Sequence, residues 1–450
     1  MGVEHMVDPP KPAPSQRSLD ASTRLLEAAV ELIPNATNTA SKGPTNWVYG
    51  VAPTHMERGD GCRCWDVDGN EYIDYPMARG PVVLGHNYPS VTAAVVDQVQ
   101  QGTAFSTPHR LQVDVAEQIV DLVPCAEMVR FAKNGNDVTA LAAKLARAHT
   151  GRSIIATQGY HGWPDVWMAD SARNAGIPTG FEGYTESFDY NDLERLQRIF
   201  EIHPDDVAAV IMTPVQLTPP ADNFLERVRT LAHRKGALLV YDEIVTGFRF
   251  APGGAQAYFD VVPDLACFAK GIANGMPLSC LAGTTDVMRT MTNDDFVFSL
   301  TYGGEATALA AAQATLAVHR TEPVTAHLFE QGETLLEGYN QLARDHGLDA
   351  YTECTGFGVR SSISFTGTET VSGSLLESLF QQECLMRGIL YAGIQFPTYS
   401  HTAADIEYTL SAYDEALGIL ADALRHGDVE DRLMGNTIGT PLPDRIAESG

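Results

Sequence analysis

The sequence predicts an α/β protein whose helices cover a mostly parallel sheet. From about residue 110 onward, short apolar segments of strand length alternate with segments of helical periodicity. Strands separated by helices pair in parallel, because each helix returns the chain to the end of the sheet where the next strand starts. The chain has 450 residues, enough for a large central domain and a smaller domain built from both chain ends.

Each element follows from periodicity and turn residues. Buried strands are predicted where apolar runs are short, at 153–156, 207–212, 237–241, 265–268 and 360–365. Helices are predicted where apolar residues recur at helical spacing, at 22–34, 111–123, 139–149, 305–318, 375–386 and 402–424. We expect five parts: a flexible arm at 1–20, the small domain at 21–80 and 321–426, the large domain at 81–320, and a polar tail at 427–450.

Residues 64–75 predict two short strands joined by a turn at Asp68 and Gly69. The same residues resemble the start of a calcium-binding loop. However, the twelfth position counted from Asp66 is Met77, where such a loop needs a bidentate Glu. The segment is therefore interpreted as a hairpin rather than as a metal site.

Composition excludes several classes of protein. The formal charge is −27, from 30 Lys and Arg against 57 Asp and Glu, which excludes a nucleic-acid binder that works by bulk positive charge. No run approaches the roughly 18 apolar residues of a membrane span, and no signal peptide is recognisable, so we expect a soluble cytoplasmic protein without a membrane partner. Seven scattered cysteines indicate reduced thiols, and the Cys62-x-Cys64 pair lacks the further ligands of a metal site.

Two carboxylates, Asp242 and Glu243, follow the predicted strand at 237–241. Functional side chains of open α/β sheets lie at the carboxyl ends of strands, where they reach the crevice. Acids in this position also occur at helix N-termini, where they satisfy free backbone N–H groups. The pattern alone leaves both interpretations open.

Lys270, one of only six lysines, follows the next strand and precedes a glycine-rich turn. Burial there would lower its pKa and make it a nucleophilic amine, whereas a solvated lysine at a strand end is the simpler alternative. An acid at one strand end and a lysine at the next favour a carbonyl-bearing cofactor whose ring nitrogen needs an anion.

Two further segments carry weaker signals. The turn at Asn134, Gly135 and Asn136 precedes a helix, whose first N–H groups suit a phosphate. Tyr160 and His161 lie in a glycine-flanked loop after the strand at 153–156. The aromatic ring there can stack on a cofactor or pack in the core.

Taken together and in order, these segments resemble the pyridoxal-phosphate (PLP) enzymes of fold type I. More narrowly, the sequence resembles the class III aminotransferases, in the branch similar to glutamate-1-semialdehyde 2,1-aminomutase. The resemblance extends from about residue 23 to residue 425. The matching motifs are Trp65–Tyr75, Leu84–His86, Glu127–Phe131, Leu145–Arg152, Tyr160–Gly162, Tyr190–Leu193, Asp242–Arg249, Gly253–Ala257 and His401–Glu407.

The resemblance implies PLP as cofactor, a mostly parallel seven-stranded sheet in the large domain, and roles for individual residues. Lys270 matches the lysine that forms the Schiff base and moves the proton, and Asp242 matches the acid that pairs with the pyridine nitrogen. The other cofactor-binding positions implied are Gly135, Asn136, Tyr160, His161, Ile244 and Thr301. Because Thr301 matches a threonine that reaches the phosphate of the neighbouring subunit, a homodimer with shared active sites is also implied.

Several departures from the family's pattern concern the phosphate and the substrate. The phosphate turn usually reads Ser-Gly-Thr-Glu, but here it is Asn134-Gly135-Asn136-Asp137, which lacks the hydroxyl donor. Thr213 replaces a glutamate that often helps manage substrate charge. The substrate-binding arginine of the aminomutase falls near Lys42. Arg79, where the aminomutase has a tryptophan, holds a carboxylate or pairs with a surface acid, and the sequence leaves the roles of Arg79 and Arg360 open.

The segment after Ala169 is shorter than the mobile lid that the aminomutase carries. An aminomutase must enclose a diamine while it is turned around, so a short lid favours ordinary transamination. The function expected is transfer of an amino group between a small-molecule donor and a keto or aldehyde acceptor. The alternatives are a 2,1-aminomutase, an amino-acid epimerase on the same scaffold, and a catalytically idle homologue.

Overall fold

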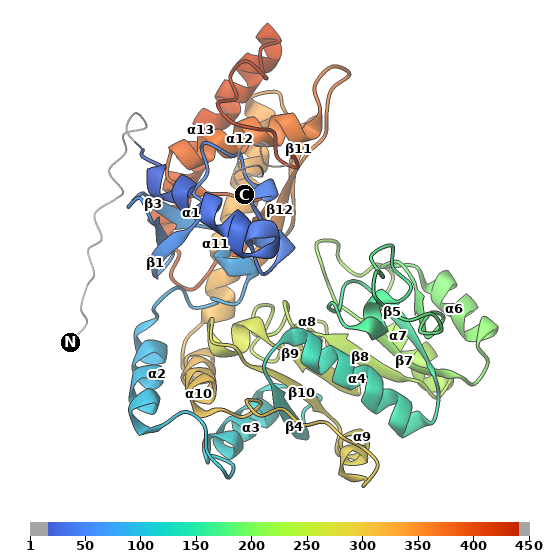
Figure 1. Ribbon diagram of the computed structural model, residues 1–450. Helices are drawn as coiled ribbons and strands as arrows, with labels where there is room; N and C mark the ends of the chain where they lie inside the picture. The colour runs from blue at the N-terminus through green and yellow to red at the C-terminus, as the bar shows by residue number, and fades with distance from the viewer. Residues whose placement is uncertain (1–16, 441–450) are drawn as a thin grey trace. The chain divides into compact units, whose positions relative to one another are not determined.

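The computed structural model describes residues 17–440, which form two compact units (Figure 1). The central unit contains residues 80–84 and 88–328. The terminal unit contains residues 17–79, 85–87 and 329–440 and so draws on both ends of the chain. The sequence analysis placed its domain boundaries after residues 80 and 320, whereas the structure places them after residues 79 and 328. Most of the expected flexible arm lies outside the described residues.

The central unit is built on a seven-stranded sheet with the order β4-β10-β9-β8-β7-β5-β6. Only β10 runs antiparallel to its neighbours, β4 and β9, so the predicted mostly parallel sheet and α/β class are confirmed. The strands are β4 (Met128–Ala132), β5 (Ile154–Gln158), β6 (Thr185–Ser187), β7 (Val207–Met212), β8 (Leu238–Asp242), β9 (Leu265–Phe268) and β10 (Ser279–Gly283).

Helices cover both faces of this sheet, because its inner strands are apolar on both sides. Val240 on β8 packs in a core cluster with residues of α4, whereas Leu239 packs with residues of α6 and α7 in another. The helices are α2 (Pro89–Gln101), α3 (Leu111–Leu122), α4 (Gly135–Thr150), α5 (Asp165–Met168), α6 (Leu193–Ile202), α7 (Phe224–Arg234), α8 (Ala255–Tyr258), α9 (Thr285–Met288) and α10 (Ala306–Thr321).

The terminal unit contains a four-stranded sheet with the order β1-β2-β3-β13 and a three-stranded sheet with the order β11-β12-β14. Helix α11 (Val324–Asp345) begins in the central unit and continues into this one. The other elements are α1 (Asp20–Leu32), β1 (Met56–Asp60), β2 (Arg63–Asp66), β3 (Glu71–Asp74), β11 (Thr352–Phe357), β12 (Arg360–Phe365), α12 (Gly373–Met386), β13 (Ile389–Leu390), β14 (Ile394–Gln395) and α13 (Ala403–His426).

The predicted hairpin is present as β2 and β3, in which Cys64 pairs with Tyr72. Asp66 stabilises the turn, because its Oδ1 accepts hydrogen bonds from the backbone N–H groups of Asp68 (3.0 Å) and Asn70 (2.8 Å). Gly69 has a φ of +87°, which suits glycine. No cluster of possible metal ligands occurs among residues 17–440.

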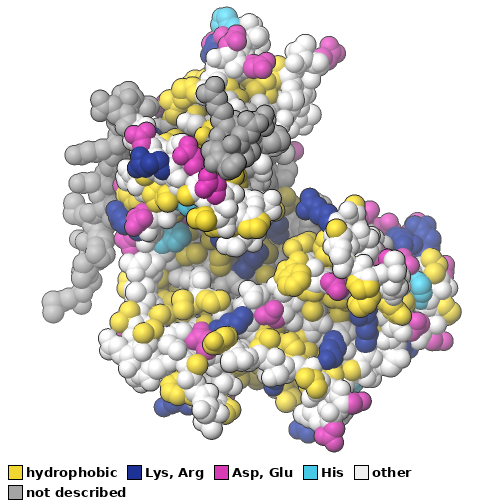
Figure 2. Space-filling view, viewed as in Figure 1, with side chains coloured by type: hydrophobic (Ala, Val, Ile, Leu, Met, Phe, Trp, Pro, Cys, Tyr) yellow, Lys and Arg dark blue, Asp and Glu magenta, His cyan; other side chains and the backbone are white. Residues whose placement is uncertain are grey.

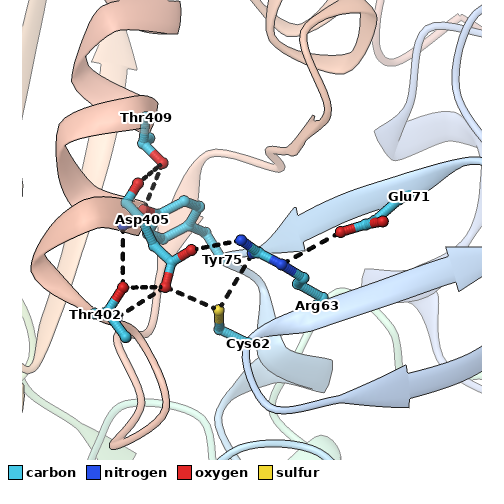
Figure 3. Close-up of polar contacts among 7 residues, drawn as sticks. All are labelled: Cys62, Arg63, Glu71, Tyr75, Thr402, Asp405 and Thr409. Carbon is cyan, nitrogen blue, oxygen red and sulfur yellow. Dashed lines mark hydrogen bonds and ion pairs between the residues drawn. The ribbon is translucent and has the colours of Figure 1, made fainter. Parts of the chain in front are cut away.

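A buried polar network joins β2 to the start of α13 (Figure 3). Asp405 accepts hydrogen bonds from the backbone N–H (2.9 Å) and hydroxyl (2.7 Å) of Thr402, forming a capping box, and pairs with Arg63 at 2.8 Å. The guanidinium of Arg63 also contacts Glu71 at 3.2 Å, and the Cys62 thiol donates to Asp405 at 3.4 Å. One carboxylate therefore caps a helix and neutralises a half-buried arginine.

The expected polar tail at 427–450 forms hydrogen bonds to the terminal unit over its described part, residues 427–440. Met434 donates its backbone N–H to Gln382 at 2.7 Å, and Ile438 donates to Ser378 at 2.9 Å, both acceptors being on α12. Gly439 donates to the carbonyl of Thr45 at 2.8 Å. Backbone hydrogen bonds to the terminal unit fix this segment, a kind of contact that its polar composition does not reveal.

The seven cysteines are free and buried, and burial raises the pKa of each thiol. On the face drawn in Figure 2, acidic side chains are interspersed with basic ones. Within residues 17–440, no helix combines the length and the apolarity needed to cross a membrane.

Asp405→Asn should lower the free energy of unfolding by about 2–4 kcal/mol, because it removes the charge that pairs with the half-buried Arg63. Urea denaturation of both proteins measures the difference. Asp414→Asn is the control, since Asp414 lies on the same helix with a side chain that is 55% exposed. Its change should be no more than about 1 kcal/mol. Equal losses in the two variants would contradict the role assigned to Asp405.

His319 on α10 is a second buried polar group, and neither ring nitrogen has a hydrogen-bond partner among the described residues. Its ring packs against that of Phe248, with centroids 5.8 Å apart. Burial, helped by the nearby charge of Arg249, lowers the pKa of His319 to about 4. The imidazole is therefore neutral in the folded protein at neutral pH.

Protonating His319 should destabilise the fold, because the unfolded chain takes up the proton near pH 6.5 and the folded chain only near pH 4. Stability should therefore fall as the pH decreases through this window, by about 3 kcal/mol in total. His319→Gln should remove this part of the pH dependence in urea denaturation between pH 7 and pH 4. His426→Gln, at an exposed position, should retain it; the same slope in both variants would refute the assignment.

Candidate active site

The carboxyl ends of the parallel strands bring four segments into one row. Met212 on β7 pairs with Gln158 on β5 and with Tyr241 on β8, so the following residues Gly159, Thr213 and Asp242 are neighbours. Asp242 in turn pairs with Cys267 on β9. The row lies at the edge where open α/β sheets bind their ligands.

Asp242 is the charged group of this row and is 5% exposed. Its Oδ2 accepts a hydrogen bond from Nδ1 of His161 at 2.7 Å, and its Oδ1 accepts from the backbone N–H of Ile244 at 3.1 Å. The other ring nitrogen of His161, Nε2, is buried without a hydrogen-bond partner among the described residues. The carboxylate of Asp242 is therefore held from two sides. In this fixed position it is a preorganised hydrogen-bond acceptor for a cationic ring nitrogen.

The turn at the start of α4 lies against the same groups. A Cβ on Gly135 would be 2.6 Å from Cδ1 of Ile244, and one on Gly162 would be 2.6 Å from Cβ of Asn136. The loops after β4, β5 and β8 therefore approach so closely that only glycine fits at these two positions. The first N–H groups of α4 have no intrahelical acceptor, so this close-packed turn can cradle a phosphate.

Asp137 takes the place of the glutamate that this turn usually carries. Its Oδ2 accepts hydrogen bonds from the backbone N–H groups of Asn134 (2.7 Å) and Lys133 (3.2 Å). The carboxylate thus closes the turn on its outer side. These two hydrogen bonds order the backbone of the turn although its side chains differ from the family's pattern.

Lys270 lies two residues after the end of β9 and begins a short 3-10 turn, Lys270–Ala273. Its φ is +45°, a left-handed conformation that is uncommon for a lysine. Strain of this kind is concentrated at functional sites. Because β9 is the neighbour of β8, Lys270 lies beyond the strand next to the one that carries Asp242.

Glu243 explains why two carboxylates occur in succession. Its side chain is fully buried and accepts hydrogen bonds from the Thr246 hydroxyl and from the backbone N–H groups of Ala255 (2.8 Å) and Gln256 (2.9 Å), at the start of α8. Burial raises the pKa of this carboxyl. Glu243 therefore fits the helix-capping alternative, whereas Asp242 lies at the carboxyl edge of the sheet, where its functional role stays a prediction.

Two other residues predicted to contact the cofactor, Tyr160 and Thr301, form no hydrogen bond with Asp242 among the described residues. Tyr160 follows Gly159 and is 73% exposed, and thus free to stack on a ring rather than packed in the core. Thr301 lines a groove of about 890 Å³ whose walls also include Phe131 and Glu305. Tyr160 directly precedes His161 along the chain, whereas no hydrogen bond joins Thr301 to Asp242 or His161 among the described residues.

The predicted substrate residues Arg79 and Lys42 lie in the terminal unit. The guanidinium of Arg79 donates to the backbone carbonyl of Ser41 at 3.0 Å, which brings it beside Lys42. Within residues 17–440 it forms no ion pair with an acid, and burial lowers its pKa. Arg360 begins β12, and its Nε is buried without a partner among the described residues.

The sequence analysis missed Gln216 and recognised Thr213 only as the replacement of a glutamate. A Cβ on Gly159 would lie 3.2 Å from Nε2 of Gln216 and 3.4 Å from Oγ1 of Thr213. Both side chains are therefore uncharged hydrogen-bonding groups at the carboxyl edge. The strand register supplies the signal for Thr213, but the loop conformation that places Gln216 has no local sequence signature.

The open α/β sheet carries a fixed carboxylate and a turn suited to a phosphate at its carboxyl edge. This combination is typical of an enzyme that depends on a phosphorylated cofactor. The family model of the class-III aminotransferases matches residues 47–417, and the chain belongs to this family. The curated relatives include a glutamate-1-semialdehyde 2,1-aminomutase of Desulforamulus reducens. It is 34% identical over 420 residues, which cover 88% of this chain and 97% of the relative.

Solved structures agree with this assignment. The PLP internal aldimine form of the FumI protein of Sphingopyxis sp. MTA144 has a TM-score of 0.83 and 30% identity, covering 90% of this chain and 97% of that one. A transaminase with PLP bound has a TM-score of 0.82 and 25% identity, covering 91% and 99%. The fold of PLP-dependent transferases is confirmed, and the family and these neighbours support PLP as the cofactor.

Gly135→Ala should lower the free energy of unfolding by about 1–3 kcal/mol, because its Cβ would overlap Cδ1 of Ile244. Ile244→Val removes that methyl group and should restore stability in the double variant. Urea denaturation of the wild type, the two single variants and the double variant measures the coupling. Additive effects would show that the turn and Ile244 are not in close contact.

Proposed function

We propose that the protein is a PLP-dependent aminotransferase that moves an amino group from a small-molecule donor to a keto or aldehyde acceptor. The observation that carries this proposal is the Asp242–His161 pair at the carboxyl edge, 2.7 Å long and buried on both sides. A buried carboxylate held in place by a hydrogen bond is the kind of group that pairs with a protonated pyridine nitrogen.

The residues of the central unit divide the work. PLP supplies an electron sink that stabilises the carbanion formed when an amino acid loses its α-proton. Asp242 would hold the ring nitrogen, and the N–H groups of Gly135 and Asn136 would bind the phosphate. Tyr160 would stack on the ring. The amine of Lys270 would bond to the aldehyde carbon of PLP with release of water and, once freed by the substrate amine, would move the proton between donor and acceptor atoms.

The loop after Ala169 supports transamination over isomerisation. Asp170 fastens this loop at its base, because its carboxylate accepts hydrogen bonds from the backbone N–H of Gly183 (3.0 Å) and the hydroxyl of Thr185 (2.8 Å). These hydrogen bonds hold the two ends of the loop together. A short, fastened loop suits an enzyme whose first product leaves before the second substrate enters.

A 2,1-aminomutase is the second candidate. The observation that favours it is the 34% identity to relatives that carry this name. An aminomutase would move the amino group within one molecule and would need no separate acceptor. Thr213 stands where the family commonly has a glutamate, so the site lacks one negative charge. This difference applies to both reactions and does not favour either one.

We also propose that the active enzyme is a homodimer in the cytoplasm. Thr301 and the groove around it then face the second subunit, where the threonine hydroxyl completes that subunit's phosphate site. In the terminal unit, Arg79 and Lys42 are the proposed contacts for a substrate carboxylate, because each carries a cationic group that suits such an anion.

Lys270→Ala should abolish the visible absorption of the lysine-bound cofactor and lower turnover at least about a thousandfold, since no other group replaces the nucleophile. Absorbance spectra of the wild type and the variant, recorded with PLP and a panel of amino donors, test this. Conversion to the pyridoxamine form with release of a carbonyl product supports transamination.

The same experiment separates the candidates. An isomerised product with the cofactor returned unchanged would establish the aminomutase or epimerase instead. Absence of any PLP-dependent absorption in the wild type would overturn every enzymatic proposal made here.

A further inference from the structure

Lys133 is a lysine at the end of β4 whose side chain is only 17% exposed. Its Nζ donates a hydrogen bond to Oε1 of Glu305 at 2.7 Å and another to the backbone carbonyl of Pro277 at 3.0 Å. The side chain of Glu305 is 12% exposed. An ion pair this shielded from water holds its geometry far more firmly than a surface pair does.

The two contacts tie three segments of the central unit together. Lys133 directly precedes the phosphate turn at Asn134 and Gly135. Pro277 belongs to the connection between Lys270 and β10. Glu305 caps the N-terminus of α10, accepting the backbone N–H groups of Thr307 (2.8 Å) and Ala308 (2.9 Å).

A neighbouring bond acts in the same direction. The Ser279 hydroxyl at the start of β10 donates to the backbone carbonyl of Asn134 at 2.9 Å. Asn134 is thus held through its carbonyl by Ser279 and through its N–H by Asp137 (2.7 Å). With Lys133 fixed as well, the residues before Gly135 have little freedom to move, although the turn lacks its usual hydroxyl side chains.

The charge of Lys133 is not available to a bound anion. Burial alone would raise the pKa of Glu305, but hydrogen bonds from Lys133 and Thr307 lower it, so the carboxylate stays ionised and the pair is neutral as a whole. The contribution of Lys133 to a phosphate would therefore come from where it holds the turn and not from attraction.

We propose that Lys133, held by Glu305 and Pro277, is a positioning residue that fixes the turn binding the phosphate of PLP. The inference rests on the proposed function, which places that phosphate at Gly135 and Asn136. These two contacts of Lys133 compensate for the missing hydroxyl donor. A turn that is already ordered loses less conformational freedom on binding the phosphate than a mobile turn would.

Lys133→Met should weaken the binding of PLP about tenfold, the equivalent of one charged hydrogen-bonding network lost. It should leave the binding of pyridoxal, which has the same aldehyde but no phosphate, within about twofold of the wild type. Equilibrium titration by absorbance measures both ligands, and thermal unfolding of the cofactor-free proteins shows whether the variants fold. A merely structural role would change both affinities together.

Three matched variants sharpen the test. Lys133→Arg keeps a cation that can reach Glu305 and should restore PLP affinity. Glu305→Gln keeps the acceptor that caps α10, loses the ion pair and should weaken PLP as Lys133→Met does. Lys144→Met, at an exposed lysine of α4 that contacts the carbonyl of Val297, is the neutral control.

Each outcome decides the question. Tighter PLP binding by Glu305→Gln would mean that Lys133 acts by charge, and the positioning role would be overturned. Equal PLP affinities for the wild type and Lys133→Met would also refute it, while leaving the proposed function intact. Failure of the wild type to bind PLP at all would instead be a failure of the proposed function.

Discussion

The lateral pairing of the parallel strands β5, β7, β8 and β9 at their carboxyl ends is the constraint on which the site depends. Because parallel strands end at one edge, residues distant in sequence become lateral neighbours without any loop having to search for the arrangement. Asp242 is the last residue of its strand and so inherits the rigidity of the sheet. His161 reaches it from the loop after β5, and their charge-assisted hydrogen bond fixes that loop in turn.

Burial of charge at this edge is balanced locally. Glu243 lies in the core at no measurable exposure, yet it meets a hydroxyl and two backbone N–H groups that would otherwise lack partners. Among the described residues, the neighbouring carboxylate of Asp242 meets two donors and retains acceptor capacity. Adjacent acids thus differ in the number of donors that each one meets, and the one with spare acceptor capacity is the one proposed to bind the cofactor.

The sequence predicted the strands of the central sheet well, because full burial on both faces leaves a continuous apolar run. The predicted strands at 207–212 and 265–268 agree with β7 and β9 to the residue. The antiparallel strand β10 and the helix α11 were not predicted individually. Strand direction and a helix shared by two units depend on tertiary contacts, which local periodicity does not report.

Some residues of the candidate site could be predicted from the sequence and others could not. Asp242 and Lys270 stand at strand ends, where the sequence pattern is informative. Gln216 and the partners of Lys133 are placed by loop geometry and by contacts between segments more than 140 residues apart, as in the Lys133–Pro277 bond. Family resemblance supplied Thr301, whose role depends on a second subunit.

The burial of all seven cysteines leaves the native protein without a reactive thiol. A thiol reacts as its thiolate, and burial that raises the pKa leaves almost none of that form at neutral pH. Thiol reagents and mild oxidants should therefore not react with the cysteines of the folded protein. A single cysteine introduced at an exposed position would be the dominant reactive sulfur, so spectroscopic labels can be attached to either unit without first removing the natural cysteines.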